Sequence, residues 1–198
     1  YTMKEITLKE KIMIKAVELF SEKGYYGTSI REIASAVECS LPMLYYYFKN
    51  KNDLYEEIAY LEFVKINDRL RLELPKQKHL KEIYTQYVLQ RKNLSEYEKS
   101  VYKLALKAWM RTEGNIDIQI KLKQWEESRI EYSRSLLRKH WGQSQACELL
   151  ISIFIRMLEN MVDKLVLINE DIPEEQIRSE IYMMFEYGAI IAEKGLIQ

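Results

Sequence analysis

The sequence predicts an all-α protein in which short N-terminal helices precede a C-terminal bundle of longer ones, about nine helices in total. Hydrophobic residues make up 47% of the 198 residues, which is enough to bury a core. Six glycines and three prolines are too few to separate the strands of a β-sandwich or barrel. Apolar residues instead recur at helical spacing along most of the chain.

The first two helices are delimited by glycine and by a cap. Apolar residues at helical spacing run from Ile6 to Phe20, and the pattern stops at Gly24, so the first helix ends there. Ser29 and Glu32 have the spacing of a capping box, which predicts a second helix over 29–37.

The next two helices also begin at polar caps. Ser40 can cap a short third helix over 41–47, and Pro42 falls in its first turn, where a missing N–H costs nothing. Asn50 can cap a fourth helix, in which the Asp53 carboxylate suits the free N–H groups and the helix dipole.

From residue 51 onward the predicted helices are longer, and proline or glycine marks several of their ends. We place the boundary between an N-terminal domain, 1–51, and a C-terminal domain, 52–198, where the fourth helix links the two. The expected long helices span 51–73, 77–93, 95–111, 115–141, 143–169 and 173–194.

The two short helices over 29–37 and 41–47 have the lengths and tight turn of a helix-turn-helix, whose second helix enters a major groove. Gly24-Tyr25, Thr28–Ala34, Ser40 and Leu44–Leu54 resemble the N-terminal DNA-binding domain of TetR/AcrR-type transcriptional regulators over about residues 8–58. The Leu-Tyr-x-x-Phe-x-x-Lys-x-x-Leu spacing is the part of the sequence that makes this family resemblance specific. The rest of the chain resembles that family only in its helical architecture.

The resemblance implies which residues contact DNA. Thr28 and Lys51 would bind backbone phosphates, Lys51 with the help of the helix N-terminus. Tyr45 and Tyr46 would touch phosphates or base edges, and residues 41–43 would face the bases. The full expected set is Thr28, Ser29, Ser40, Leu41, Pro42, Met43, Tyr45, Tyr46, Tyr47 and Lys51.

The second of these helices, over 41–47 and called here the recognition helix, departs from the family pattern together with the turn before it. Many relatives carry Gly at 38, Lys at 41, Gly at 42 and Thr at 43. Leu41 and Met43 cannot form bidentate bonds to bases, although they can contact a thymine methyl. Phosphate contacts, tyrosines and DNA shape are therefore expected to carry more of the specificity. The Glu38 carboxylate is expected to weaken nonspecific DNA binding unless it accepts from a cytosine amine or faces away.

The resemblance also implies a pocket for a small-molecule effector inside the C-terminal bundle, where aromatic residues and Met can line an apolar site. The alternative is that each of these side chains simply fills the core. Acidic residues such as Glu113 or Glu159 could suit a cationic effector. The expected lining residues are Tyr60, Phe63, Tyr102, Trp109, Met110, Trp125, Phe154 and Met157.

The last two helices carry wide apolar faces, and in the family two such helices from each subunit form a four-helix dimer interface. The small Gly188 would permit close approach of two helices. The alternative is that both faces pack within one subunit. The expected interface residues are Met161, Leu165, Ile181, Met184, Phe185 and Gly188.

Together with these features, the resemblance implies a homodimeric repressor that binds a palindromic double-stranded DNA operator and is released by a small-molecule effector. A ligand-independent or activating regulator and a helical protein-interaction scaffold stay open as alternatives. Two cysteines 108 residues apart indicate a reducing, cytoplasmic setting, and charges interrupt the apolar stretch 149–168, so no membrane span is expected. His79 and His140 lie in no metal-binding or catalytic pattern, so we expect no metal, no cofactor and no enzymatic activity.

Overall fold

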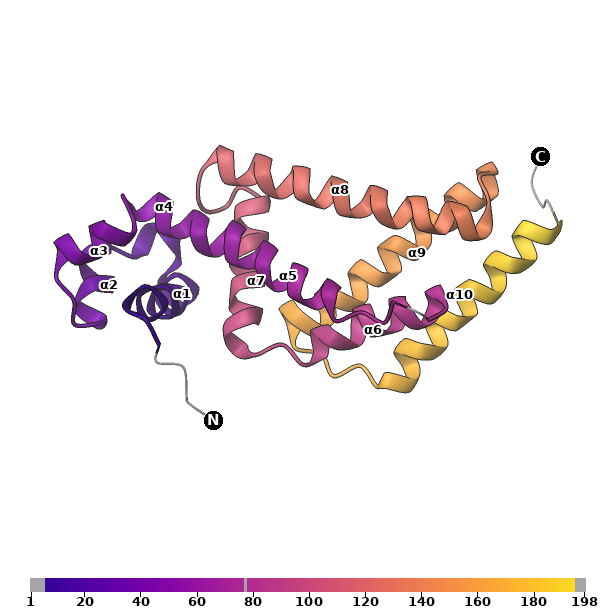
Figure 1. The fold of residues 1–198 in the computed structure, drawn as a ribbon, viewed down its shortest axis with the longest axis horizontal. Coiled ribbons are helices and arrows are strands. Elements are labelled where there is room, and N and C mark those ends of the chain that lie inside the picture. Colours follow the sequence, from indigo (N-terminus) through magenta and orange to yellow (C-terminus); the bar gives the residue numbers. More distant parts are fainter. Residues whose placement is uncertain (1–5, 77, 195–198) are drawn as a thin grey trace. The chain divides into compact units, whose positions relative to one another are not determined.

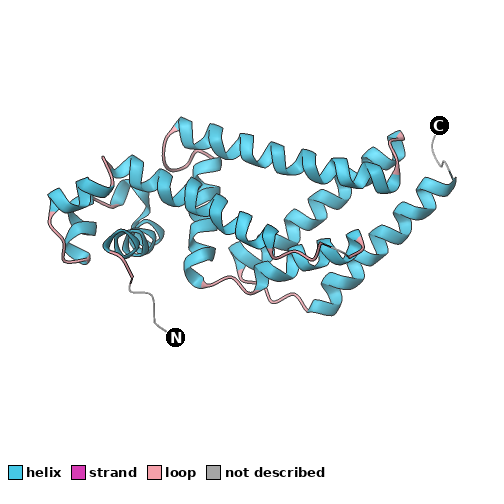
Figure 2. Ribbon diagram, viewed as in Figure 1, coloured by secondary structure: helices cyan, strands magenta, loops and turns pink. Residues whose placement is uncertain are grey.

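The computed structural model describes residues 6–76 and 78–194, and within those ranges the chain forms helices and loops without a strand (Figure 2). Two helices contain a π-helical segment, and with each of these counted as one helix the described chain has nine. They are α1 (Leu8–Gly27), α2 (Ile30–Ala36), α3 (Leu41–Tyr47), α4–η1–α5 (Lys51–Glu56, Glu57–Glu62, Phe63–Leu72), α6 (Leu80–Lys92), α7 (Glu96–Trp109), α8 (Ile116–Trp141), α9–η2 (Gln145–Asp163, Lys164–Ile168) and α10 (Glu174–Lys194). The all-α prediction is confirmed.

Most predicted helix ends lie within a few residues of the observed ones. The α1 helix is broken at Gly24, whose φ of 74° lies in the left-handed region that glycine adopts without strain. The expected helix over 77–93 begins at Leu80; residue 77 itself lies outside the described residues. The π-helical turns η1 and η2 were not predicted, because apolar spacing does not distinguish i→i+5 from i→i+4 hydrogen bonding.

Two compact units form, and they do not follow the predicted division at residue 51. The first comprises the chain up to Asn67 together with residues 95–123, and the second comprises residues 68–94 and the chain from Gln124 onward. The reason is that α7 packs against α1 and against η1, so the N-terminal helices share their core with a segment far along the chain (Figure 1).

The core of the first unit is built around Tyr55 and Phe20, which are fully buried and meet edge to face with their ring centroids 5.2 Å apart. Leu44 of α3 and Phe48, which follows this helix directly, are buried as well. The Leu104 side chain of α7 is also fully buried in this unit.

The core of the second unit contains a cluster of four aromatic side chains from four helices. Phe154 of α9 lies 5.1 Å from Tyr84, 5.5 Å from Trp141 and 5.5 Å from Phe185, measured between ring centroids. Trp141 packs so closely on Gly188 of α10 that a Cβ there would lie 2.3 Å from the indole Nε1.

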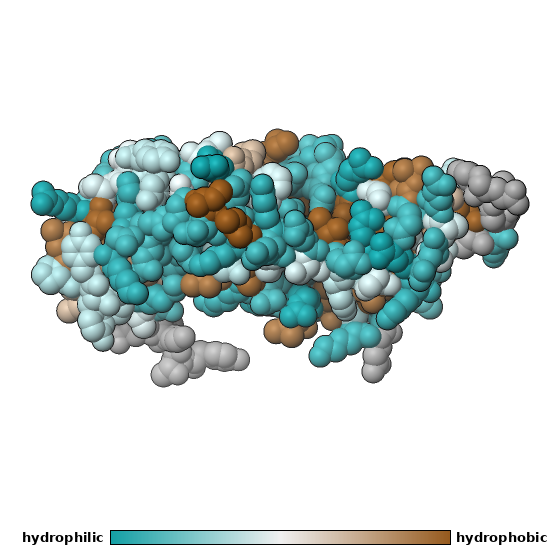
Figure 3. Space-filling model, turned by 90° about the horizontal axis from the view of Figure 1, so that it is seen from above, coloured by the Kyte–Doolittle hydropathy of each residue, from teal (hydrophilic) through white to brown (hydrophobic). Residues whose placement is uncertain are grey.

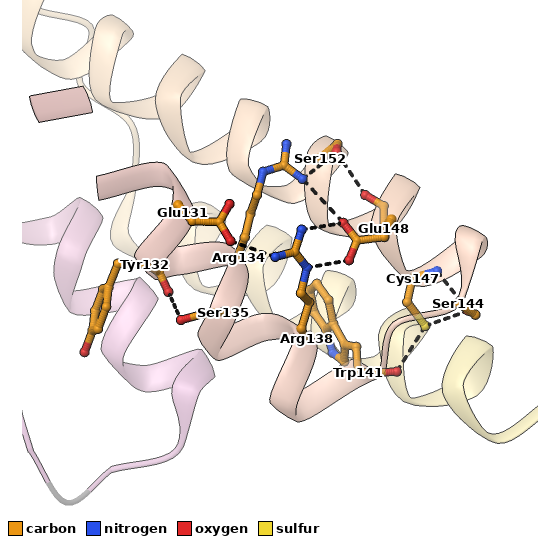
Figure 4. Close-up of polar contacts among 10 residues, drawn as sticks. All are labelled: Glu131, Tyr132, Arg134, Ser135, Arg138, Trp141, Ser144, Cys147, Glu148 and Ser152. Carbon is orange, nitrogen blue, oxygen red and sulfur yellow. Dashed lines mark hydrogen bonds and ion pairs between the residues drawn. The ribbon is translucent and has the colours of Figure 1, made fainter. Parts of the chain in front are cut away.

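A polar network joins the end of α8 to the start of α9 in this second unit (Figure 4). Arg138 binds Glu148 with two donors, Nε to Oε1 at 2.6 Å and Nη2 to Oε2 at 3.2 Å, and its Nη1 binds Glu131 at 2.7 Å. Ser144 caps α9 by accepting the Cys147 N–H at 3.2 Å. The bidentate geometry orients the two helices relative to each other.

This ion pair makes stability depend on pH. Hydrogen bonding and charge attraction from Arg138 hold the pKa of Glu148 below its ordinary value. The pair therefore contributes stability above the pKa that Glu148 has in the unfolded chain, and that stability is lost as the pH falls through the lower folded-state pKa. Glu148→Gln is expected to lower the melting temperature at pH 7 and to flatten its decline between about pH 5 and pH 3.

The measurement is thermal unfolding at a series of pH values, with Glu96→Gln on the exposed start of α7 as the control. A parallel decline for Glu148→Gln and the unaltered protein would show that this ion pair does not contribute to the acid sensitivity.

Candidate nucleic-acid interface

The two helices of the helix-turn-helix begin at hydroxyl caps on the surface. The Ser29 Oγ accepts the Glu32 N–H at 3.1 Å, and the Ser40 Oγ accepts the Met43 N–H at 3.4 Å. Each Oγ is exposed and keeps its own hydrogen as a donor, so either serine could donate to a phosphate while it caps its helix. The Glu32 carboxylate completes no capping box and pairs with Lys23 instead.

The third helix turns aromatic and sulfur-containing side chains toward solvent. Tyr46 is 80% exposed, Tyr45 50% and Met43 45%, whereas Leu44 between them is fully buried. Pro42 is exposed too, and Leu41 and Tyr47 are half-buried. This arrangement offers two phenol hydroxyls and a thioether to a groove, with few polar groups that could form bidentate bonds to bases.

The structure corrects the expectation for Thr28, whose side chain is only 2% exposed. Its hydroxyl donates to the Leu19 carbonyl at 3.1 Å and to the Gly24 carbonyl at 2.9 Å. A buried hydroxyl that is already bonded to the main chain cannot reach a phosphate. Thr28 instead stabilises the end of α1.

Lys51 stands at the N-terminus of α4 and is held in place by main-chain carbonyls. Its Nζ donates to the Tyr25 carbonyl at 2.9 Å and to the Thr28 carbonyl at 3.1 Å, and it lies 4.3 Å from the centroid of the Tyr25 ring. An ammonium has three hydrogens, so one remains for a phosphate. These contacts thus hold the Lys51 side chain in place in the protein without DNA.

Two further cations on this surface were missed by the sequence analysis. Arg31 on α2 and Lys49 after α3 are exposed and form no ion pair within the described ranges. Sequence spacing does not reveal which basic residues are neutralised by a carboxylate, and Lys23, which pairs with Glu32, shows the difference. Unpaired cations are the ones that can replace counterions at phosphates.

Glu38 lies in the turn between α2 and α3 with a φ of 55°, the left-handed conformation that costs most residues about 1 kcal/mol. Glu38→Gly is expected to raise the free energy of unfolding by about 1 kcal/mol and also to tighten DNA binding, since it removes a carboxylate beside the recognition helix. Glu38→Gln keeps the strained backbone and removes only the charge, so it should tighten DNA binding without the gain in stability.

Urea unfolding and DNA binding at fixed salt measure the two effects separately. An equal gain in stability for Gly and Gln would mean that backbone strain at residue 38 is not the cause.

The expected effector residues are distributed over both units. In the first unit Phe63 and Tyr102 meet edge to face at 4.9 Å, and the Tyr102 hydroxyl donates to the Asn67 Oδ1 at 2.6 Å. Tyr60 is half-buried there, whereas Trp109 and Met110 are exposed at the end of α7 and do not line an interior. In the second unit Phe154 is fully buried in the aromatic cluster, while Trp125 and Met157 are half-buried.

The structure also corrects most of the expected dimer residues, which pack inside the second unit. Met184 is half-buried, and the buried ones are Met161, Leu165, Ile181, Phe185 and Gly188. Two stripes of other apolar residues on the same helices are exposed: Leu149 and Ile153 on α9, and Met183, Tyr187 and Ile190 on α10. Both helices are apolar on more than one side, and periodicity alone does not tell which side faces inward.

No group of three or more metal-ligating side chains gathers within the described ranges. Burial raises the pKa of the Cys39 thiol near the recognition helix, which makes it a poor nucleophile at neutral pH. None of the described helices is both long enough and apolar enough to cross a membrane.

Comparison with known proteins places the helix-turn-helix in one family. Residues 12–58 match the family model of the bacterial regulatory proteins, tetR family. The chain is 43% identical over 55 residues to the "Probable HTH-type transcriptional regulator YttP" of Bacillus subtilis, covering 28% of this chain and 27% of that protein. It is 46% identical over 50 residues to IcaR of Staphylococcus aureus, a biofilm operon icaADBC HTH-type negative transcriptional regulator, covering 25% and 27%. The matches thus span about a quarter of these curated relatives.

Solved structures extend the likeness to the whole fold. A TetR-family transcriptional regulator from Bordetella parapertussis superimposes with a TM-score of 0.71 at 19% identity, covering 98% of this chain and 100% of that one. The fatty acid degradation regulator FadR from Bacillus halodurans gives a TM-score of 0.62 at 18% identity, covering 98% of both chains.

Fold and site together define a helix-turn-helix DNA-binding domain carried on a helical bundle. Residues 12–58 thus resemble the corresponding segment of the tetR family of bacterial regulatory proteins, and the chain as a whole has the fold of solved TetR-family regulators.

Proposed function

We propose that this protein is a repressor that binds a palindromic DNA operator as a homodimer in the cytoplasm and is released by a small-molecule effector. The observation that carries the DNA-binding part is the exposed face of α3, where Met43, Tyr45 and Tyr46 project from a helix whose Leu44 is anchored in the core. The similarity to a negative regulator over the DNA-binding segment supports repression as the sign of control.

Phosphate contacts would position the reading helix. Lys51, Arg31 and Lys49 supply cations, and the Ser29 and Ser40 hydroxyls supply neutral donors. Base reading would then depend on the two tyrosines, on contact of Met43 with a thymine methyl, and on DNA shape.

Dimerisation would use the exposed stripes of the last two helices rather than the buried residues. Leu149 and Ile153 on α9, with Met183, Tyr187 and Ile190 on α10, leave apolar surface uncovered on the second unit. Figure 3 shows that apolar residues interrupt an otherwise largely hydrophilic face in separate patches. An isologous interface between two copies would cover such stripes and bring two recognition helices to one palindrome.

A charge within the α10 stripe should break this interface. Tyr187→Glu is expected to convert the dimer to monomers at micromolar concentration, because a carboxylate would be buried without a partner. Sedimentation equilibrium measures the change, and Tyr132→Glu, which alters an exposed tyrosine on α8, is the matched control. Equal dissociation constants for Tyr187→Glu and the unaltered protein would rule out this face.

Effector release would act through the long helix that begins at Lys51. Its central turn, η1, is π-helical and carries Tyr60, and Phe63 follows directly after it. Such π-helical turns are frequent at functional sites, and a shift in this helix would move Lys51 relative to the DNA. The coupling needed is about 1–3 kcal/mol.

The experiment that tests the function is capture of genomic DNA fragments by the purified protein, followed by footprinting of the best fragment with and without a mixed effector library. A protected palindrome that is lost with an effector supports the full proposal, and one that no compound alters favours a ligand-independent regulator. Absence of salt-dependent DNA binding would favour the helical protein-interaction scaffold, since phosphate contacts impose a steep salt dependence.

A further inference from the structure

A buried tyrosine connects the DNA-binding helices of the first unit to the loop between α7 and α8. Tyr55 on α4 is fully buried, and its hydroxyl lies 3.2 Å from the Leu104 carbonyl and 3.2 Å from the Glu113 Oε2. Its ring meets Phe20 at 5.2 Å and Tyr25 at 4.9 Å. Burial, followed by the Glu113 charge, raises the pKa of Tyr55, so the hydroxyl stays a hydrogen-bond donor.

The loop fits closely against the end of α1. The Glu113 carboxylate also binds the Lys107 ammonium at 3.0 Å. A Cβ on Gly24 would lie 3.1 Å from the Glu113 Oε1, and a Cβ on Gly114 would lie 3.0 Å from the Tyr55 ring. Both glycines have positive φ, 74° and 76°, so neither position accommodates another residue without strain.

The segment 24–28, called here the 24–28 turn, contacts Glu113 at one end and Lys51 further along. The Gly24 carbonyl accepts the Thr28 hydroxyl at 2.9 Å, and the carbonyls of Tyr25 and Thr28 accept from the Lys51 Nζ. The conformation of this turn therefore sets where the Lys51 ammonium lies.

We propose that Glu113 and Tyr55 are positioning residues for operator binding: they hold the 24–28 turn, and through it the Lys51 Nζ, in the place from which it reaches a phosphate. The inference rests on the proposed function. Glu113 lies outside the segment 12–58 that matches the family model, so the DNA-binding domain depends on a carboxylate from much later in the chain.

For Glu113, this positioning role differs from the one that the sequence suggested, which was an acidic ligand for a cationic effector. Both carboxylate oxygens of Glu113 are engaged, Oε1 by Lys107 and Oε2 by Tyr55. The loop between α7 and α8 is thus in direct contact with the DNA-binding helices. A change in this loop would reach Lys51 through Tyr55 and the 24–28 turn.

The test uses Glu113→Ala and Tyr55→Phe in the 198-residue chain. Glu96→Ala and Tyr97→Phe, two changes of the same chemistry on α7, are the matched controls. Operator affinity is measured over a range of salt concentrations, and amide hydrogen exchange of residues 24–29 is measured without DNA. Tyr55→Phe keeps the buried ring, so the test survives if Glu113→Ala does not fold.

We expect each variant to lower operator affinity about tenfold, the effect of one charge-assisted contact, and to reduce the salt slope by about 1. Exchange at residues 24–29 should accelerate, and the controls should change neither quantity. In a Lys51→Met background, Glu113→Ala should cause no further loss of affinity, because the contact that it positions is already absent.

A tenfold loss that persists in the Lys51→Met background would overturn the proposal, as would unchanged exchange at residues 24–29. If the unaltered protein binds no DNA, the proposed function fails and the hydrogen-exchange comparison still decides whether Glu113 and Tyr55 hold the turn.

Discussion

Replacing Tyr45 and Tyr46 together by alanine is expected to lower operator affinity about a hundredfold while the fold stays intact. Both side chains are at least half exposed on α3, and neither supports the core, which is anchored there by Leu44 and Phe48. Loss of two contacts worth about 1.4 kcal/mol each corresponds to that factor. Alanine also has a higher helix propensity than tyrosine, so α3 should not be weakened.

Fluorescence anisotropy with the footprinted operator at fixed salt measures this loss, and thermal unfolding checks the fold. Tyr132→Ala removes an equally exposed tyrosine from α8 and should leave affinity unchanged. Equal operator affinity for the double variant and the Tyr132 control would exclude α3 as the reading helix.

Gly188→Ala is expected to destabilise the second unit by about 1–3 kcal/mol, even though alanine is the better helix former. A Cβ at this position would lie 2.3 Å from the Trp141 Nε1 and 2.4 Å from its Cε2, so the buried indole would have to move. Trp141 in turn contacts Phe154 and Phe185, and displacement would spread through the aromatic cluster.

Urea unfolding measures the effect, and a second substitution isolates its cause. Trp141→Ala removes the indole that meets the new methyl group, so Gly188→Ala should cost less in that background than in the unaltered protein. Gly27→Ala, where a Cβ would meet only the Lys23 Cβ at an ordinary 3.4 Å, is the control. Full additivity of the two changes would show that the methyl group does not collide with the indole.

The local features of the fold were predictable because their causes are local. Ser29, Ser40 and Asn50 cap their helices in the structure as expected, since a cap needs only its own side chain and an N–H three residues later. Gly24 interrupts α1 with a positive φ, which glycine adopts without strain because it has no Cβ. The motif that resembles the TetR family consists of such short-range features.

The direction in which side chains point was predictable only in part. Tyr45 and Tyr46 project outward, because three successive helical positions cannot all face the core. Thr28 was misjudged because its hydroxyl bonds to carbonyls of α1, a contact that spacing does not show. The expected dimer residues were misjudged because α9 and α10 are apolar on both their inner and outer sides.

The sequence by itself determined the helices, their caps and the outward-facing residues of α3, because each depends on residues within about one helical turn. Only the tertiary structure decided that α7 and its following loop join the DNA-binding helices, that Glu113 lies against Gly24, and that Phe154 and Phe185 share one core. Those outcomes depend on the packing of segments far apart in the chain, where the shapes of several side chains must fit at once. The spacing of apolar residues along one helix does not show which other segments that helix will pack against.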